Sequence, residues 1–296
     1  MQALWMLLAS LLFASMGVCI KFASTHFTSF EVVFFRGLIG LVFMAGVMRV
    51  RRVSLATPVP AMHLWRSAVG TTALTTWFFS IAALPLATAM TLNYMSSVWI
   101  AAFLVGGALL LQRQGEPIHN QGPLLLSVLA GFAGVAMMLR PTMADNQLFG
   151  GLLGLLSGIF SALAYLQVSA LSKAGEPETR TVFYFSLGAT LVGAVGMLLM
   201  GTSPWNGPHA WWLLPIGLLA VLGQLCMTRA YASGATLVVA NLQYMGIVFA
   251  GIYSIVIFDD ELPLLGWAGM ALIIASGIVA TMLRAKAAPQ TPPEEH

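Results

Sequence analysis

The stretch LNYM at residues 92–95 returns as LQYM at residues 242–245, a shift of 150 positions. Further matches run in the same order along the chain: VFF at 33–35 with VFY at 182–184, Val98 with Val248, Glu116 with Glu261, and MLR at 138–140 with MLR at 282–284. Self-similarity at a nearly constant spacing is the signature of a duplicated unit. The sequence therefore predicts two homologous halves, residues 1–143 and 146–286.

The composition excludes an ordinary soluble protein. Of the 296 residues 59% are apolar and only 8% are charged, with a mean hydropathy of +0.88, whereas soluble domains carry roughly 25% charged residues. An apolar excess also argues against disorder. The net charge of +3 is small and dispersed, so no nucleic-acid partner is predicted. Two cysteines in apolar surroundings, Cys19 and Cys226, give neither a disulfide framework nor a zinc signature, and no metal or cofactor is predicted.

Ten apolar runs are long enough to cross a bilayer, which takes about 20 residues per helix. They fall at residues 3–22, 31–49, 65–84, 87–111, 122–140, 148–171, 180–201, 210–232, 236–257 and 263–283. Continuous apolar runs exclude a β-barrel, whose strands alternate apolar and polar residues. The predicted fold is thus an all-α polytopic membrane protein, and the polar tail 287–296 is predicted to be disordered and cytoplasmic.

Each half contains five spans, and an odd number makes the second half enter the membrane from the opposite face. Inverted repeats of this kind build many secondary transporters, which work by alternating access. A duplicated structural or enzymatic membrane protein is the alternative on this evidence.

Positive charges give the predicted orientation. With the N-terminus in the cytoplasm, the inner loops and C-terminus hold Arg49, Arg51, Arg52, Arg66, Arg113, Lys173, Arg180, Arg284 and Lys286, and the outer loops hold Lys21 and Arg140. Because cytoplasmic loops are enriched in Lys and Arg, both termini are predicted to be cytoplasmic.

Ten spans in two repeats, Arg36 in the second span, and Glu116 and Glu261 closing the fourth and ninth form a recognisable pattern. In these features the chain resembles the EamA-type members of the drug/metabolite transporter superfamily over nearly its whole length. It is most similar to the YddG-type bacterial amino acid exporters. The resemblance implies a location in the bacterial cytoplasmic (inner) membrane and export of aromatic and other neutral amino acids. The first span departs from relatives that carry a coupling carboxylate there, since it holds no acidic residue.

Acidic residues and histidines fall at span ends or in loops, which argues against a proton relay inside the membrane. Facilitated diffusion is therefore favoured over proton antiport. A position of Glu31 or Glu261 at the rim of the cavity would reverse this preference. A catalytic constellation is also missing from the spans, so an enzyme is not predicted. Arg36 begins only about 7–8 Å along its helix from Glu31, at 1.5 Å per residue, and is interpreted as snorkelling or structural rather than as a carboxylate anchor.

Uncharged polar and aromatic side chains within the spans are the candidate substrate-binding residues, because amides in lipid must face the bundle or a wet cavity. They are Trp77, Asn93, Tyr94, Trp99, Tyr165, Gln167, Gln224, Tyr231, Gln243 and Tyr244. Hydrogen bonds between helices without any ligand are the alternative role for each. Gly150, Gly154 and Gly158 form a small-residue stripe that favours close helix packing over a gating hinge.

A cavity lined by amides, hydroxyls and rings, without fixed charge, suits a net-neutral solute with an apolar body. The sequence therefore predicts a facilitative exporter of neutral, aromatic or large hydrophobic amino acids that works as a monomer in the lipid bilayer. A proton-coupled multidrug or metabolite exporter is one alternative, and a membrane enzyme or sensor without transport is another.

Overall fold

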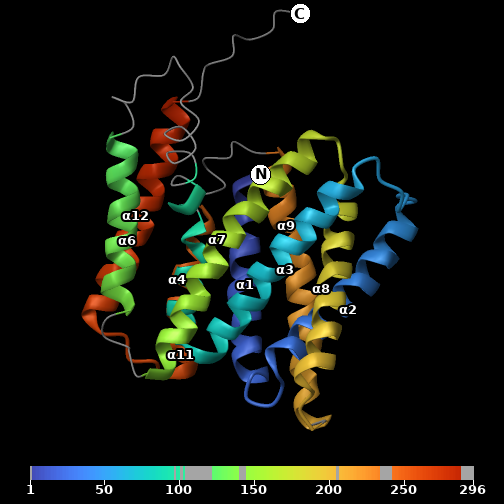
Figure 1. Cartoon of the computed structure of the whole chain (residues 1–296), viewed down its shortest axis with the longest axis horizontal. Helices are drawn as coiled ribbons and strands as arrows, with labels where there is room; N and C mark the ends of the chain where they lie inside the picture. Colours follow the sequence, from blue (N-terminus) through green and yellow to red (C-terminus); the bar gives the residue numbers. More distant parts are fainter. Residues whose placement is uncertain are drawn as a thin grey trace, which may run out of the picture.

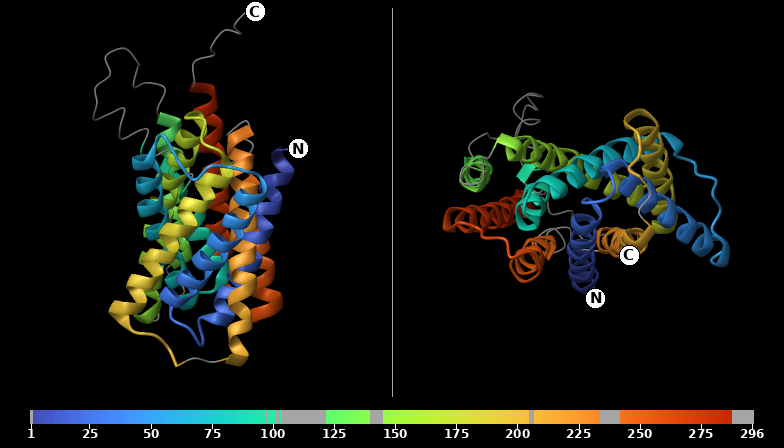
Figure 2. Two further views of the ribbon diagram at one scale, coloured as in Figure 1. Left: turned by 90° about the vertical axis from the view of Figure 1, so that its right-hand side faces the viewer. Right: turned by 90° about the horizontal axis from the view of Figure 1, so that it is seen from below.

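The computed structural model describes residues 2–96, 98–100, 103, 122–139, 145–204, 207–233 and 242–287. Within these ranges every regular element is a helix. The helices are α1 (Gln2–Ala23), α2 (Ser29–Val50), α3 (Pro60–Ala83), α4 (Leu86–Tyr94), α6 (Gly122–Leu139), α7 (Asp145–Lys173), α8 (Glu178–Met200), the short 3₁₀ helix η3 (Gly207–Trp212), α9 (Leu213–Ser233), α11 (Met245–Phe258) and α12 (Leu264–Ala287). The helices run side by side as a bundle, and the N-terminus and the end of α12 lie at the same end of it (Figures 1 and 2).

Local sequence signals explain where several helices begin and end. Thr28 and Glu31 form a capping box that starts α2, in which each side chain bonds the other's backbone N–H. Pro60 starts α3, five residues before the predicted edge, since proline at the first helical position gives up no intrahelical bond. The αL conformation of Asp259, with φ 50°, ends α11.

Five helices are long and apolar enough to cross a membrane by length and composition: Leu4–Ala23, Ser29–Val50, Gln147–Lys173, Glu178–Met200 and Gly207–Tyr231. Met245–Phe258 and Leu264–Val279 are shorter apolar helices. The long helices also expose apolar side chains on their outer faces. Val42 of α2 and Leu198 of α8, for example, are 66% and 85% exposed. Large exposed apolar surfaces mark contact with lipid or with another protein.

The fourth and ninth predicted spans differ from the continuous helices expected at 87–111 and 236–257. Regular helix is interrupted at Met95, after α4, and at Tyr244, before α11. These two interruptions fall at neighbouring positions of the LNYM and LQYM stretches. Residues 101–102, 104–121 and 234–241 lie outside the described part of the chain, and so does Glu116.

Helix packing follows a small set of close pairs. The most extensive contacts join α2 to α8, α3 to α7, α6 to α12 and α1 to α9, and α4 packs on α7 and α11. Figure 1 shows α6 and α12 side by side at one edge of the bundle and α2 and α8 at the other, with α1, α3, α4 and α7 between them.

Small residues make the α7 contacts possible. A Cβ added at Gly158 would lie 2.7 Å from the carbonyl oxygen of Leu92, and one at Gly154 would lie 2.8 Å from Oγ of Ser80. A Cβ at Gly150 would meet the Cβ of Ala83 at 2.7 Å. The glycine stripe therefore packs α7 against α3 and α4, as the favoured interpretation of its spacing predicted.

Candidate functional site

A narrow pocket lies at the centre of the bundle, where seven helices contribute side chains. It is lined by Phe13 of α1, Arg36 of α2, Arg66, Gly70, Ala73, Leu74 and Trp77 of α3, Asn93 and Tyr94 of α4, Ser161, Ala164 and Tyr165 of α7, Phe185 of α8, and Gln224 and Met227 of α9. Its free volume of about 50 Å³ is enough for a few water molecules. Admission of an organic solute therefore requires the surrounding helices to separate.

Asn93 links α4 to α7 inside this pocket. Its Nδ2 donates to Oγ of Ser157 at 3.0 Å and to Oγ of Ser161 at 3.1 Å. Asn93 is only 4% exposed, and these bonds satisfy an amide that burial would otherwise penalise. The side chain is held next to the interruption at Met95, where α4 ends.

Gln243 does not line the pocket itself, but it links Tyr165 of α7, which does, to Tyr231 of α9. Its Nε2 donates to the Tyr165 hydroxyl at 3.1 Å, and its Oε1 accepts from the Tyr231 hydroxyl at 2.9 Å. The two tyrosine rings are stacked, with centroids 5.8 Å apart. Asn93 and Gln243, which the repeat aligns, thus each tie α7 to another segment of the bundle.

The structure brings together some of the predicted binding residues and separates others. Five of them line the pocket: Trp77, Asn93, Tyr94, Tyr165 and Gln224. Gln243 and Tyr231 join it through the hydrogen bonds to Tyr165. Trp99, Gln167 and Tyr244 do not line it.

The three outlying residues have other surroundings. Trp99 stacks on Phe103, with ring centroids 6.3 Å apart. Gln167 is half-buried on α7. Tyr244 packs against Gly277 of α12. Whether any of the ten residues binds substrate stays a prediction.

Two arginines in the pocket correct the expectation of a cavity without fixed charge. Arg36 and Arg66 are 4% and 3% exposed, and their guanidinium carbons lie 5.0 and 4.3 Å from the ring centroid of Phe185. Arg36 therefore does not snorkel but lies inside the bundle, the other position that its interpretation left open. Arg66, which the charge pattern places with the inner-loop charges, lies inside α3, because this helix starts at Pro60.

Sequence reasoning missed Arg66 because it stands near the edge of an apolar run. One signal could have revealed it: Gly70 follows one helical turn later. A Cβ at Gly70 would occupy the space of the Arg66 guanidinium and lie 2.9 Å from Cε2 of Phe185. The glycine thus leaves room for the arginine side chain beside the ring.

Neither acidic residue proposed for a cavity rim lines the pocket. Glu31 accepts hydrogen bonds from the backbone N–H of Thr28 at 2.7 Å and from the N–H and hydroxyl of Ser203 at 3.2 and 2.9 Å. Glu261 is exposed in the turn after α11. Among the residues with described side chains, no Asp or Glu lines the pocket.

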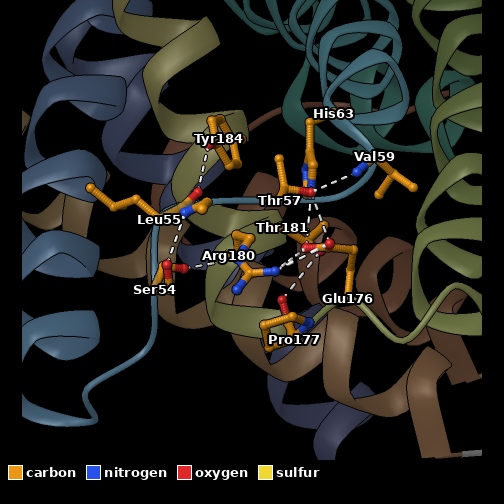
Figure 3. Close-up of polar contacts among 11 residues, drawn as sticks. Ser54, Leu55, Thr57, Val59, His63, Glu176, Pro177, Arg180, Thr181 and Tyr184 are labelled. Atoms are coloured by element: carbon orange, nitrogen blue, oxygen red, sulfur yellow. Dashed lines mark hydrogen bonds and ion pairs between the residues drawn. The ribbon is translucent and has the colours of Figure 1, made fainter.

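A second buried polar cluster lies at the end of the bundle that holds the N-terminus (Figures 1 and 3). Its centre is Glu176, between α7 and α8, with a side chain 1% exposed. Thr57 donates to Oε1 at 2.8 Å, Nη1 of Arg180 bonds both carboxylate oxygens at 3.2 and 3.0 Å, and Nε2 of His63 lies 3.1 Å from Oε2. We call Thr57, His63, Glu176 and Arg180 the Glu176 clamp.

The Glu176 clamp attaches the α2–α3 loop to α8. Arg180 Nε donates to the Ser54 carbonyl at 3.0 Å, and the Tyr184 hydroxyl donates to the Leu55 carbonyl at 2.7 Å, as Figure 3 shows. Burial alone would raise the pKa of Glu176, but the hydrogen bonds from Thr57, Arg180 and His63 outweigh it and hold this pKa below the ordinary value. The carboxylate is therefore ionised at neutral pH.

Comparison with known proteins identifies the family. The chain is 33% identical over 271 residues to the pseudopaline exporter CntI of Pseudomonas aeruginosa, covering 92% of each chain. The EamA-like transporter family model matches residues 148–282. This chain belongs to the EamA-like transporter family.

Other transporters are similar to this chain over most of their length. An uncharacterized transporter of Helicobacter pylori is 26% identical, covering 93% of each chain, and a riboflavin transporter of Rhizobium johnstonii is 27% identical, covering 93% of this chain and 89% of that one. A solved crystal structure superposes with a TM-score of 0.68 at 18% identity, covering 97% of this chain and 99% of the other. The EamA-like protein described here is therefore a multi-pass membrane transporter with an established type of fold.

Proposed function

We propose that this protein exports amino acids, or small solutes derived from them, through the central pocket by alternating access. The observation that carries the proposal is the pocket together with the amide hydrogen bonds at it. Asn93 lines the pocket and ties α4 to α7, and Gln243, beside it, bonds Tyr165 of α7 and Tyr231 of α9. Binding sites near interrupted helices, at the contact between inverted repeats, recur in secondary transporters. The similarity to an exporter favours outward movement of the solute.

We also propose that the protein lies in the bacterial inner membrane with both termini in the cytoplasm. When Arg66 is no longer counted among the cytoplasmic loop charges, most of the arginines and lysines still lie on the cytoplasmic side. The Glu176 clamp then lies at the cytoplasmic end of the bundle.

Aromatic amino acids are the first candidate substrates. The rings of Phe13, Trp77 and Phe185 line the pocket and offer contacts to an aromatic body. A carboxylate on the solute would find the guanidinium groups of Arg36 and Arg66 nearby. We propose facilitated diffusion because neither Glu31 nor Glu261 lines the pocket.

A solute other than a free amino acid is the second candidate. This is favoured by the positive charge of the pocket, which has no acidic partner among its described lining residues. A zwitterion would leave its ammonium group without an anion to pair with.

The test is uptake of labelled phenylalanine, tryptophan, methionine and threonine into proteoliposomes, without an imposed gradient. We expect saturable uptake that excess unlabelled amino acid suppresses. Gln243→Ala should reduce it, since Tyr165 and Tyr231 then lose their common partner. Gly46→Ala is the matched control, because a Cβ at Gly46 meets nothing within 4 Å.

Absence of uptake, with or without a pH or sodium gradient of either sign, would contradict the amino acid assignment. Uptake that appears only with a pH gradient would contradict facilitated diffusion and favour proton coupling.

A further inference from the structure

The unpaired polar atoms of the pocket are all hydrogen-bond donors. Among the described residues that line it, the buried nitrogen and oxygen atoms without a partner are Nε of Arg36, Nε and Nη1 of Arg66, and Nε1 of Trp77. Buried donors are normally satisfied, and an orphaned one costs free energy. A ligand that satisfies these four atoms must bring acceptors.

The two guanidinium groups also lie close together. Both contact the ring of Phe185, so their carbons cannot be further apart than the sum of 5.0 and 4.3 Å. Like charges at this separation repel one another strongly in apolar surroundings. An anion placed beside them removes the repulsion and satisfies the donors at once.

The buried carboxylates Glu31 and Glu176 do not neutralise Arg36 and Arg66. Glu31 is held by Thr28 and Ser203, and Glu176 is held by the clamp. Within the described part of the chain, neither pocket arginine makes a hydrogen bond or an ion pair. Arg36 and Arg66 are thus built into the bundle as an uncompensated cationic site.

We propose that the arginine pair is a carboxylate-binding site and that the transported solute carries two carboxylates, with a net negative charge. This inference rests on the proposed transport function and selects the second candidate, an acidic solute, over the neutral aromatic amino acids. Each planar guanidinium matches one carboxylate with two parallel hydrogen bonds. Trp77 Nε1 adds a donor beside them, and the rings of Phe13 and Trp77 contact the apolar part of the solute.

The test uses three compounds with one phenyl body and a graded number of carboxylates. 3-Phenylpropanamide has none, 3-phenylpropanoate has one and benzylsuccinate has two. Dissociation constants are measured by calorimetry on the purified full-length protein in detergent. We expect affinity to rise by about ten-fold or more with each carboxylate, the range of charge-assisted hydrogen bonds.

Four variants separate a binding role from a structural one. Arg36→Gln and Arg66→Gln should each abolish the gain from the second carboxylate while leaving the melting temperature unchanged or higher, because a buried repulsion is removed. Gly70→Ala keeps both charges but displaces the Arg66 guanidinium, and should weaken benzylsuccinate binding. Arg51→Gln removes an exposed loop charge and should change nothing.

The inference is overturned if affinity does not depend on the number of carboxylates, or if inorganic phosphate competes as well as benzylsuccinate. It is also overturned if the Gln variants melt at a lower temperature and bind the three compounds as the wild type does. Uptake into proteoliposomes tests the other claim separately. Phenylalanine uptake without carboxylate-dependent binding rejects the arginine site and keeps the transport function. Arginine-dependent binding without uptake of any of these compounds rejects the transport function and keeps the site.

Discussion

Glu176 illustrates how one buried charge can hold a loop in place. Its carboxylate is inaccessible, yet Thr57, His63 and Arg180 surround it with donors. If the carboxylate is removed, the buried groups that bond it are left without their acceptor. The side chain should therefore matter more to stability than a charge at the surface would.

We predict that Glu176→Gln lowers the free energy of unfolding by about 1–3 kcal/mol at neutral pH, as for hydrogen bonds to charged groups. The pKa of Glu176 is lower in the folded state than in the unfolded state. The carboxylate therefore makes its full contribution to the free energy of unfolding above about pH 5, and this contribution is lost as the pH falls through the folded-state pKa. Melting temperatures of wild type and variant, measured from pH 8 down to pH 3.5, should converge at the acidic end. The exposed Glu261→Gln is the control. A gap between the two melting curves that grows in acid would refute this assignment.

The sequence could identify which polar residues face the bundle, but not their partners. Asn93, Tyr165 and Gln243 follow from the cost of placing an amide or phenol in lipid, and all three lie in or beside the pocket. Arg66 could not be found this way, since a positive charge near the edge of an apolar run equally fits a loop. Its role depends on Phe185 and Gly70, which come from tertiary contacts.

At the scale of the elements, α7 is the helix that joins the others. Its glycine stripe faces α3 and α4, and its Ser157, Ser161 and Tyr165 bond Asn93 and Gln243. The packing of α7 could be predicted from glycine spacing alone, because small residues every four positions form one face. The helix interruptions at Met95 and Tyr244 could not, since the apolar runs continue through both.

We predict that Gly158→Ala destabilises the protein by about 1–3 kcal/mol, the range for overpacking. The new Cβ would lie 2.7 Å from the Leu92 carbonyl oxygen, and backbone at a helix end cannot move aside as a flexible side chain can. Gly46→Ala, where the Cβ meets nothing within 4 Å, should instead be neutral or stabilise α2 by up to about 1 kcal/mol through helix propensity. Thermal unfolding in detergent measures both. Equal melting temperatures for the two variants would show that the α7 contact is not tight.

At the scale of the whole molecule, the helix contacts match the proposed inverted repeat. The repeat aligns α1 with α7, α2 with α8, α3 with α9, α4 with α11 and α6 with α12. Exchanging the two halves turns the α3–α7 pair into the α9–α1 pair and leaves the α2–α8 and α6–α12 pairs unchanged, and all four are the extensive contacts of the bundle. Two homologous halves, as short matches such as LNYM and LQYM predict, would give this pattern of contacts, and the two halves stay a prediction. The all-helical membrane fold was accessible from the sequence because it depends on the lengths of the apolar runs. The charge of the pocket could not be predicted in this way, because it depends on which helices meet there in the folded protein.

Alternating access predicts that a pocket residue meets water from each side of the membrane in turn. Ala164 lines the pocket on α7 and is 3% exposed, so Ala164→Cys, in a chain with Cys19 and Cys226 replaced by alanine, reports on it. Val42→Cys, on the exposed apolar face of α2, is the control that should stay unlabelled.

The most direct measurement is therefore labelling of Ala164→Cys by a membrane-impermeant thiol reagent, in whole cells and in inverted membrane vesicles. We predict labelling from both sides, with saturating solute increasing it on one side and decreasing it on the other. Labelling from one side only, whatever solute is present, or equal labelling that no solute alters, would contradict alternating access through this pocket.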